Sequence, residues 1–201
     1  MKSDPKAVKD SFFPRQETRV IVPAKVDSIR TTNLYLRPLE IGDAAALFEY
    51  RSRQDVADWL QKPIFETKSS KPPDASGAIG RQFVFAVISA TDPMQKVIGA
   101  VGINGLAPSP SLGYGIHPDY WGKGYASEAV AAVVDAWWKL PRKEAEPRME
   151  LNGGTEKLFA AANKANVGSV KVLQKNEFEI ISEAPLDGDT VATFVLERPG
   201  R

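Results

Sequence analysis

The chain has 201 residues, 26 basic and 25 acidic side chains, and a formal net charge of +1. This length suits one domain with a substantial core, and the 43% hydrophobic and 25% charged shares exclude a mostly disordered or fibrous chain. The absence of cysteine excludes a disulfide framework, a thiolate nucleophile and a cysteine-ligated metal. The single histidine, His117, excludes a multi-histidine metal site, so we expect no metal.

The same numbers bear on location and partners. The near-zero net charge argues against a nucleic-acid partner. No apolar run approaches the ~20 residues that a membrane-spanning helix needs, and the first residues lack the apolar stretch of a signal peptide. We therefore expect a cytoplasmic protein without membrane association, either a monomer or a homodimer.

The first part of the chain predicts an extension followed by a domain. Residues 1–28 are polar and interrupted by prolines, which predicts an N-terminal extension before a single domain over 29–201. Leu34–Leu39 is rich in β-forming residues and predicts a strand. Asp43 is expected to cap a helix, with a second short helix over Gln54–Leu60. The expected apolar positions of the first helix are Ala44, Leu47 and Phe48.

Three further strands are predicted in the middle of the chain. Residues 62–80 form a long loop by composition, because prolines, glycines and serines dominate there. The strands that follow are expected over Phe83–Ser89, Val97–Ile103 and Ser111–His117. In the last of these, Gly113 and Gly115 share one face. Two glycines in a strand are typical of a bulge or of a place where another group approaches the backbone closely.

The last part of the chain alternates helices and strands. A helix is predicted from Gly124 to Lys139, where Pro141 stops it, and residues 140–155 form another loop. Asn166 is expected to open a short helix. Strands are expected over Leu158–Ala162, Phe178–Ser182 and Val191–Leu196, with a hairpin turn before the last. The resulting order predicts one α/β (α+β) domain built around one sheet.

The segment with the clearest chemistry runs from a strand through a glycine loop into a helix at residues 122–127. The first turn of a helix presents unpaired N–H groups and the positive end of its dipole, and glycine lets the backbone approach an anion. Lys123 adds a cation and Ser127 a hydroxyl. The same glycine spacing also occurs in ordinary turns, so the residues alone leave anion binding open. A Walker loop is excluded because a Lys-Ser/Thr pair is missing, and Ser127 stands at the sixth position of a dinucleotide fingerprint, where glycine is required.

Three segments resemble one enzyme family, the GNAT N-acetyltransferases, and most closely its branch of ribosomal-protein N-terminal acetyltransferases. These segments are Tyr120–Ala129 (YWGKGYASEA), Asn166–Phe178 (NVGSVKVLQKNEF) and Thr31–Pro38 (TTNLYLRP). They fall in the family's order, and the resemblance covers about residues 28–197. It implies the GNAT fold: a single central, mixed, mostly antiparallel sheet of six to seven strands flanked by about four helices.

Two residues depart from the family pattern. Asp119 stands three residues before the first loop glycine, where the family has Gln or Arg. Glu177 replaces the glycine of a Lys-x-Gly-Phe segment, which implies a different backbone turn at that point. The loops at 62–80 and 140–155 are longer than is usual in the family. The site that binds the acceptor of the acetyl group therefore cannot be inferred from relatives.

The resemblance also implies a co-substrate, acetyl-CoA, and a role for each matched residue. The backbone of Ile116 and His117 would pair with the pantetheine arm beside the thioester. Asn166 and Ser169 would lie by the pantetheine and the sulfur, and Ser169 is the candidate catalytic acid for the departing thiolate. The pyrophosphate would be held by the N–H groups of Gly122, Lys123, Gly124, Tyr125, Ala126 and Ser127.

Several assignments stay open at this point. Asn166 could serve only as a helix cap, and His117 has the chemistry of a general base without any spacing that requires it. Other candidate bases are Asp58, Glu66 and Asp74. The predicted activity is acetyl transfer from acetyl-CoA to a primary amine, either a protein or peptide N-terminus or a small molecule, by direct attack. The alternative is a non-catalytic acyl-CoA-binding module of the same fold.

Overall fold

The structure is a computed structural model that describes residues 13, 14, 16, 18–59, 83–106, 109–143, 155–186 and 188–200. The predicted loop 62–80, most of the loop 140–155 and most of the first seventeen residues lie outside this part. The chain divides into two compact units. We call them the α4 unit, Val22–Ile103 with Gly113–Lys139, and the α5 unit, Met1–Ile21 with Asn104–Leu112 and Leu140–Arg201.

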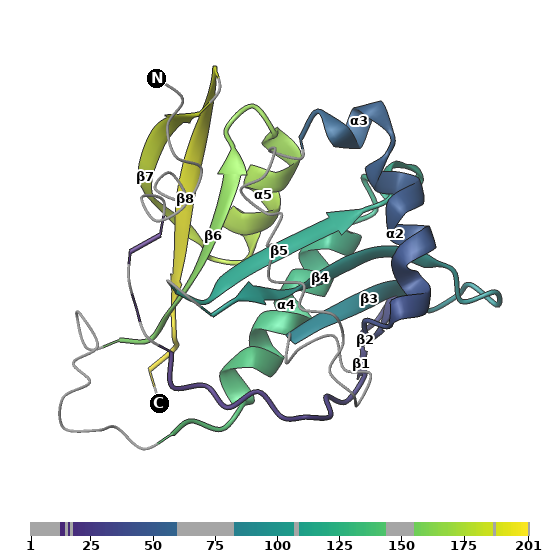
Figure 1. Cartoon of the computed structure of the whole chain (residues 1–201), viewed down its shortest axis with the longest axis horizontal. Coiled ribbons are helices and arrows are strands. Elements are labelled where there is room, and N and C mark those ends of the chain that lie inside the picture. The colour runs from purple at the N-terminus through teal and green to yellow at the C-terminus, as the bar shows by residue number, and fades with distance from the viewer. Residues whose placement is uncertain are drawn as a thin grey trace. The chain divides into compact units, whose positions relative to one another are not determined.

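The α4 unit is built on antiparallel strands. β1, β2, β3 and β4 pair in this order, each antiparallel to the next, and β5 is the neighbour of β4 (Figure 1). Their bounds are Ile29–Arg30, Leu34–Pro38, Phe83–Ser89, Val97–Gly105 and Ser111–Ile116. Four of the five were predicted. The two-residue β1 is too short for any period to show in the sequence.

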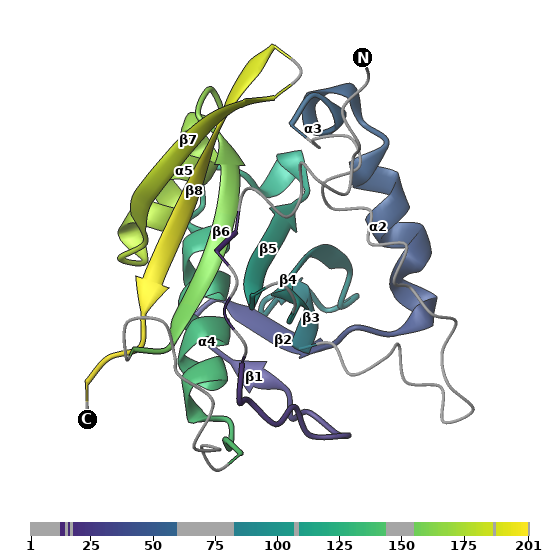
Figure 2. The ribbon, with the colours of Figure 1, turned by 60° about the vertical axis from the view of Figure 1, so that its left-hand side comes forward.

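Helices α2 (Ala44–Arg51) and α4 (Tyr125–Lys139) cover opposite faces of these strands (Figure 2). Side chains alternate between the two faces of a strand. On β3, Phe83 packs against Trp137 of α4, with ring centroids 5.8 Å apart, whereas Ile88 belongs to the cluster that includes Leu47 of α2. Shorter helical segments lie at Ile41–Asp43, Gln54–Ala57 (α3) and Pro118–Tyr120.

The α5 unit is a three-stranded antiparallel arrangement with one helix. The strands pair in the order β6, β8, β7, and Ser111 at the start of β5 pairs with Phe159 of β6 in parallel. Phe159 packs in a buried cluster with Phe13 and Val195. The elements are β6 (Lys157–Asn163), α5 (Val167–Lys175), β7 (Glu179–Leu186) and β8 (Asp189–Glu197).

The hydrogen-bonded strand order is therefore β1-β2-β3-β4-β5-β6-β8-β7, in one sheet that is mixed and mostly antiparallel. This confirms the predicted architecture, including its four α-helices within the described residues. The sheet has eight strands in place of the expected six to seven. No helix in the described part of the chain is long and apolar enough to cross a membrane.

Two expectations for α2 were wrong. Asp43 precedes the helix, but its carboxylate accepts no hydrogen bond from the first turn of α2. It accepts two from Arg37, at 2.6 and 2.8 Å, and one from the N–H of Glu40 at 2.8 Å, because the neighbouring strand brings a guanidinium within reach. Phe48, one of the three positions expected on the apolar side of the helix, is 73% exposed, and Tyr50 is buried instead.

The end of α5 corrects the expectation for Glu177. Its φ is 64°, in the left-handed region that glycine favours, so the backbone turn is the one a glycine would make. The Phe178 N–H donates to the Leu173 carbonyl and the Glu177 N–H to the Gln174 carbonyl, which is the Schellman pattern of helix termination. Leu173 and Phe178 are both buried. Their burial holds Glu177 in a conformation that costs a non-glycine residue about 1 kcal/mol.

Replacing Glu177 with glycine is therefore expected to stabilise the protein. The gain should be about 0.5 to 1 kcal/mol, because the relief of strain exceeds the entropy that glycine adds to the unfolded chain. Urea unfolding measures this change. The matched control is Lys175→Gly inside α5, which should lose about 1 kcal/mol. A destabilised Glu177→Gly variant would show that the glutamate is not strained.

Candidate functional site

The glycine loop lies between β5 and α4, as the sequence predicts. Gly122 and Gly124 have φ values of 75° and 79°, which L side chains adopt at a cost, and no protein atom lies within 4 Å of a Cβ placed at either. The Gly124 carbonyl accepts from the Glu128 N–H at 3.0 Å, so the helix begins here. The N–H groups of Tyr125, Ala126 and Ser127 therefore belong to its first turn. Together these features form an exposed surface suited to an anion.

The first turn of α4 is anchored from the other side by Glu128. Its carboxylate accepts from the backbone N–H and the side-chain amide of Asn33, at 2.7 and 2.9 Å. Burial raises the pKa of Glu128, but hydrogen bonds from Thr31 and Asn33 hold that pKa below its usual value. The carboxylate thus stays ionised, and it fixes the helix end that the loop enters.

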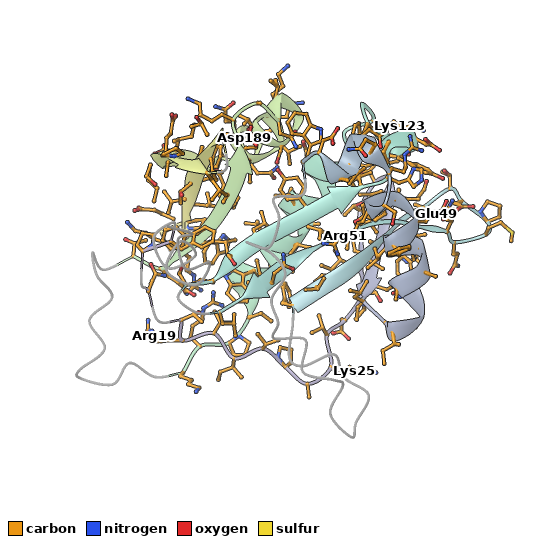
Figure 3. The ribbon with its side chains drawn as sticks, turned by 45° about the horizontal axis from the view of Figure 1, so that its top comes forward. Arg19, Lys25, Glu49, Arg51, Lys123 and Asp189 are labelled. Carbon is orange, nitrogen blue, oxygen red and sulfur yellow. The ribbon has the colours of Figure 1, made fainter. Side chains whose placement is uncertain are left out.

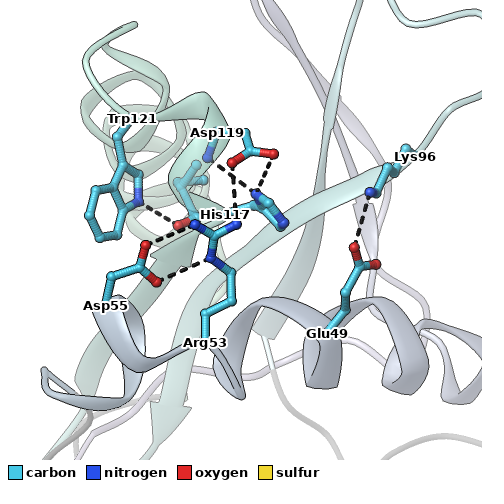
Figure 4. A network of polar contacts seen from close by, with 8 residues as sticks. Glu49, Arg53, Asp55, Lys96, His117, Asp119 and Trp121 are labelled. Atoms are coloured by element: carbon cyan, nitrogen blue, oxygen red, sulfur yellow. Dashed lines mark hydrogen bonds and ion pairs between the residues drawn. The ribbon is translucent and has the colours of Figure 1, made fainter.

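Trp121 ties the loop back to the strand. Its indole Nε1–H donates to the Ile116 carbonyl at 2.6 Å (Figure 4). The His117 N–H donates to the Ile98 carbonyl of β4 at 2.7 Å. Of the two residues expected to pair with pantetheine, His117 has its N–H committed to the sheet, and the Ile116 carbonyl keeps its second lone pair as an acceptor.

The His117 side chain caps the short helical turn that follows it. The His117 side chain is 6% exposed, and its Nδ1 accepts from the Asp119 N–H at 3.2 Å. Tyr50 and Tyr120 flank it, with ring centroids 6.3 and 6.0 Å away. A neutral imidazole has one lone pair, and the cap uses it, so the proton of the neutral ring lies on Nε2. This arrangement favours a structural role for His117 over general-base catalysis.

Replacement of His117 by asparagine tests this assignment. The Asn Oδ1 atom can accept the same backbone hydrogen bond, so kcat/KM should stay within a few-fold of the parent and keep its pH profile. Removing a general base would cost about 10²-fold or more. A loss of that size, together with loss of the acidic limb of the pH profile, would restore His117 as the base.

Asp119, which replaces the Gln or Arg of the family pattern, belongs to a surface network (Figure 4). Its carboxylate accepts from Arg53 at 3.3 Å, and Arg53 also forms two hydrogen bonds to Asp55, at 2.9 and 3.1 Å. The side chains of Arg53 and Asp119 are 42% and 66% exposed. Exposed pairs of this kind contribute little to stability, so the network orients Asp119 rather than holding the fold together.

Lys123 lies on the exposed outer side of the loop (Figure 3). Its Nζ is 4.9 Å from the centroid of the Tyr120 ring, a cation–π contact. The ammonium therefore lies beside the loop and does not contact the backbone N–H groups at the start of α4 through any hydrogen bond. It can swing toward an anion on its flexible stem.

In the α5 unit, Asn166 is the N-cap of α5, as predicted. Its Oδ1 accepts from the Ser169 N–H at 2.9 Å, and its backbone carbonyl accepts from the Val170 N–H at 3.0 Å. The cap uses only the oxygen of the side-chain amide. Ser169 lies in the first turn of the helix and is half-buried.

The predicted site residues thus fall into two sets. Residues 116, 117 and 122–127 lie together in the α4 unit, whereas Asn166 and Ser169 lie in the α5 unit. Of the candidate bases, Asp58 is exposed and accepts a hydrogen bond from Gln54, and Glu66 and Asp74 lie outside the described residues. Among the described side chains, no group of three or more histidines, aspartates or glutamates could hold a metal.

Sequence reasoning missed one residue near the loop, Tyr50 on α2. It is 5% exposed, and its hydroxyl lies 3.1 Å from the position of a Cβ on Gly115 of β5. Two signals pointed to it: its three-residue spacing from Leu47, and the glycine at 115. The expected close approach to the glycine face of β5 is therefore made by a phenol.

Comparison with known proteins gives the following matches. The family model for the acetyltransferase (GNAT) domain matches residues 33–179. The uncharacterised N-acetyltransferase p20 of Bacillus licheniformis is 28% identical over 164 residues, which cover 77% of this chain and 83% of that protein.

Solved structures match over most of their length. The ribosomal-protein-S5-alanine acetyltransferase of Vibrio fischeri has a TM-score of 0.59 at 20% identity, covering 86% of this chain and 97% of that one. The protein AAC(6')-Ib, in complex with paromomycin and acetyl-CoA, has a TM-score of 0.54 at 15% identity, covering 82% and 93%. At these identities the structural matches show the fold.

Proposed function

Because the chain belongs to the acetyltransferase (GNAT) family and is an acyltransferase, we propose that it moves the acetyl group of acetyl-CoA to a primary amine. The amine would attack directly in a ternary complex. Acetyl-CoA is the natural donor for this family, and one protein of the same fold is bound to it. The observation that carries the proposal is the open glycine loop at the start of α4.

The loop suits the pyrophosphate of the cofactor. Two glycines in left-handed conformations lead into the start of a helix, and apart from the adjacent residues nothing lies within 4 Å of either glycine's Cβ position, which leaves room for an anion beside the backbone. We assign the pyrophosphate to the N–H groups of Gly122, Lys123, Gly124, Tyr125, Ala126 and Ser127. The Ile116 carbonyl would accept from the pantetheine arm, next to His117.

For the α5 unit, the support is the sequence resemblance together with the cap geometry. Asn166 would contact the pantetheine through its amide nitrogen, since its oxygen caps the helix. Ser169 would give a proton to the departing thiolate. We keep both as proposals that rest on the matched segment Asn166–Phe178.

The chemistry needs few protein groups because the cofactor carries the activated acyl group. A neutral amine attacks the thioester carbon, the carbonyl oxygen becomes an oxyanion, and the thiolate leaves as the C–S bond breaks. The amine loses a proton to water or to a base, and the thiolate gains one from Ser169, which takes a proton back from water. The reaction forms no covalent enzyme intermediate, which agrees with the absence of cysteine.

The acceptor class follows from no residue in the described part of the chain. One structural neighbour is named for a ribosomal protein and another is bound to paromomycin, so proteins of this fold are associated with both macromolecules and small molecules. We therefore propose that the acetyl acceptor is a primary amine. The assay below distinguishes an amine at a protein or peptide N-terminus from an amine on a small molecule.

The experiment is release of free CoA from acetyl-CoA in the presence of a panel of small amines and of peptides with free N-termini. We expect turnover with at least one class. Ser169→Ala should lower kcat about tenfold, below the usual range for acid catalysis, because a thiolate is a good leaving group even without full protonation. Binding of acetyl-CoA without turnover across the panel would favour the non-catalytic acyl-CoA-binding module.

A further inference from the structure

The residue that stands out in the α4 unit is Tyr50, a buried phenol at the glycine face of β5. It lies near the end of α2 and is 5% exposed. A Cβ placed on Gly115 would be 3.1 Å from the Tyr50 hydroxyl and 3.7 Å from its Cζ. The phenol therefore takes the space that a side chain at 115 would fill, and it reaches the strand backbone directly.

Within the residues that the structure describes, the hydroxyl makes no hydrogen bond, yet it is not among the fully buried polar atoms that lack a partner. The ring of Tyr50 is thus packed in the protein while its hydroxyl stays open to a small bound group, as is common for tyrosines that have one apolar and one accessible end. This points to a partner that is absent from the free protein.

The protonation state of the phenol limits what it can do. Burial raises the pKa of Tyr50, against a smaller opposing effect of the Arg51 charge. The phenol is therefore neutral over the working pH range and serves as a hydrogen-bond donor rather than as a base. The group that it meets must accept a hydrogen bond.

The position of Gly115 indicates which group accepts the hydrogen bond from Tyr50. Gly115 immediately precedes Ile116 and His117, where the proposed function places the thioester, and the rings of Tyr50 and His117 are 6.3 Å apart. His117 has its Nδ1 occupied by the Asp119 N–H and its backbone N–H occupied by Ile98, so neither atom serves the thioester. Two donors remain at this end of β5, the His117 Nε2–H and the Tyr50 hydroxyl, and it is the Tyr50 hydroxyl that lies against Gly115.

We propose that the Tyr50 hydroxyl is a catalytic residue that donates a hydrogen bond to the thioester carbonyl oxygen, an inference that rests on the proposed acetyl transfer. When the amine nitrogen bonds to the carbonyl carbon, the π electron pair moves to the oxygen. The Tyr50 hydrogen bond strengthens as that charge develops, and the proton stays on Tyr50. When the C–S bond breaks, the carbonyl re-forms and the hydrogen bond returns to its original strength.

The test is Tyr50→Phe, which removes only the oxygen. We expect kcat to fall about 100-fold, as for removal of other oxyanion donors, while the Kd for acetyl-CoA and the KM for the amine change little. The melting temperature should stay the same or rise, because no hydrogen bond within the protein is lost. The matched control is Tyr35→Phe, since the Tyr35 hydroxyl bonds Ser28 on the surface at 3.2 Å, and its kinetics should match the parent.

A spectroscopic measurement tests the Tyr50 hydrogen bond separately from the proposed acetyl transfer. The infrared carbonyl band of [1-13C]acetyl-CoA bound to the protein should shift to higher wavenumber in Tyr50→Phe, because the hydrogen bond to the carbonyl is gone. An unmoved band, or a raised amine KM at unchanged kcat, would overturn the role of Tyr50. Failure of the parent protein to bind acetyl-CoA would instead overturn the proposed function.

Discussion

The affinity for acetyl-CoA is expected to fall by more than about 100-fold when either Gly122 or Gly124 is replaced by glutamate. Each glycine has open space where a side chain would begin, so the glutamate would project into the surface that the pyrophosphate is proposed to occupy. Two like charges a few ångströms apart at a protein surface repel by about 3 to 4 kcal/mol, and 2.7 kcal/mol corresponds to a factor of 100. Titration calorimetry measures the change.

The matched control for this prediction is Gly188→Glu. Gly188 also has a positive φ, 93°, and no protein atom within 4 Å of its Cβ position. It lies in the β7–β8 hairpin, so it carries the same backbone strain and the same added charge without the proposed phosphate contact. Its affinity for acetyl-CoA should equal that of the parent. Equal weakening in all three variants would attribute the effect to strain or net charge and not to the loop.

The second large effect concerns stability, and it lies in the α5 unit. The Glu156 side chain is 8% exposed and joins two guanidinium groups. Arg142 donates through Nε and Nη2 at 3.1 and 3.3 Å, and Arg198 donates through Nη1 at 3.3 Å. Removal of the carboxylate by Glu156→Ala takes away the acceptor of three guanidinium hydrogen bonds in a nearly buried cluster. We expect a loss of about 3 kcal/mol, as for other broken buried pairs.

Thermal and urea unfolding measure this loss. For a chain of this length, 3 kcal/mol corresponds to a fall of about 6 to 12 °C in Tm. The control is Glu183→Ala, which removes an exposed partner of Lys164 in the same unit and should cost less than about 1 kcal/mol. If the two variants unfold alike, the cluster around Glu156 does not hold the α5 unit together.

The sequence predicted the elements whose pattern is local. The apolar run of β3, the stripe of α4 and the Asn166 cap of α5 all lie within a few residues of where the pattern placed them. Each of these depends on periodicity or capping inside one segment. The glycine loop was predicted for the same reason, since Gly122 and Gly124 are needed for its own backbone.

What the sequence did not predict depends on contacts that reach beyond a single helix or strand. Asp43 bonds Arg37 instead of capping its helix because a strand places the guanidinium beside it. Glu177 keeps the turn of a glycine because the burial of Leu173 and Phe178 outweighs local strain. Tyr50 reaches Gly115 only through the packing of α2 on β5, which no local pattern reports.

The central claim is that the N–H groups at the start of α4 hold the pyrophosphate of acetyl-CoA. Amide-resolved NMR of the 15N-labelled protein tests it most directly, with acetyl-CoA compared against acetyl-pantetheine, which lacks the pyrophosphate. We predict that acetyl-CoA shifts the N–H signals of Gly122, Gly124 and Ala126 strongly, that acetyl-pantetheine leaves them nearly unchanged, and that Gly188 responds to neither. Loop signals that do not respond to saturating acetyl-CoA would contradict the account.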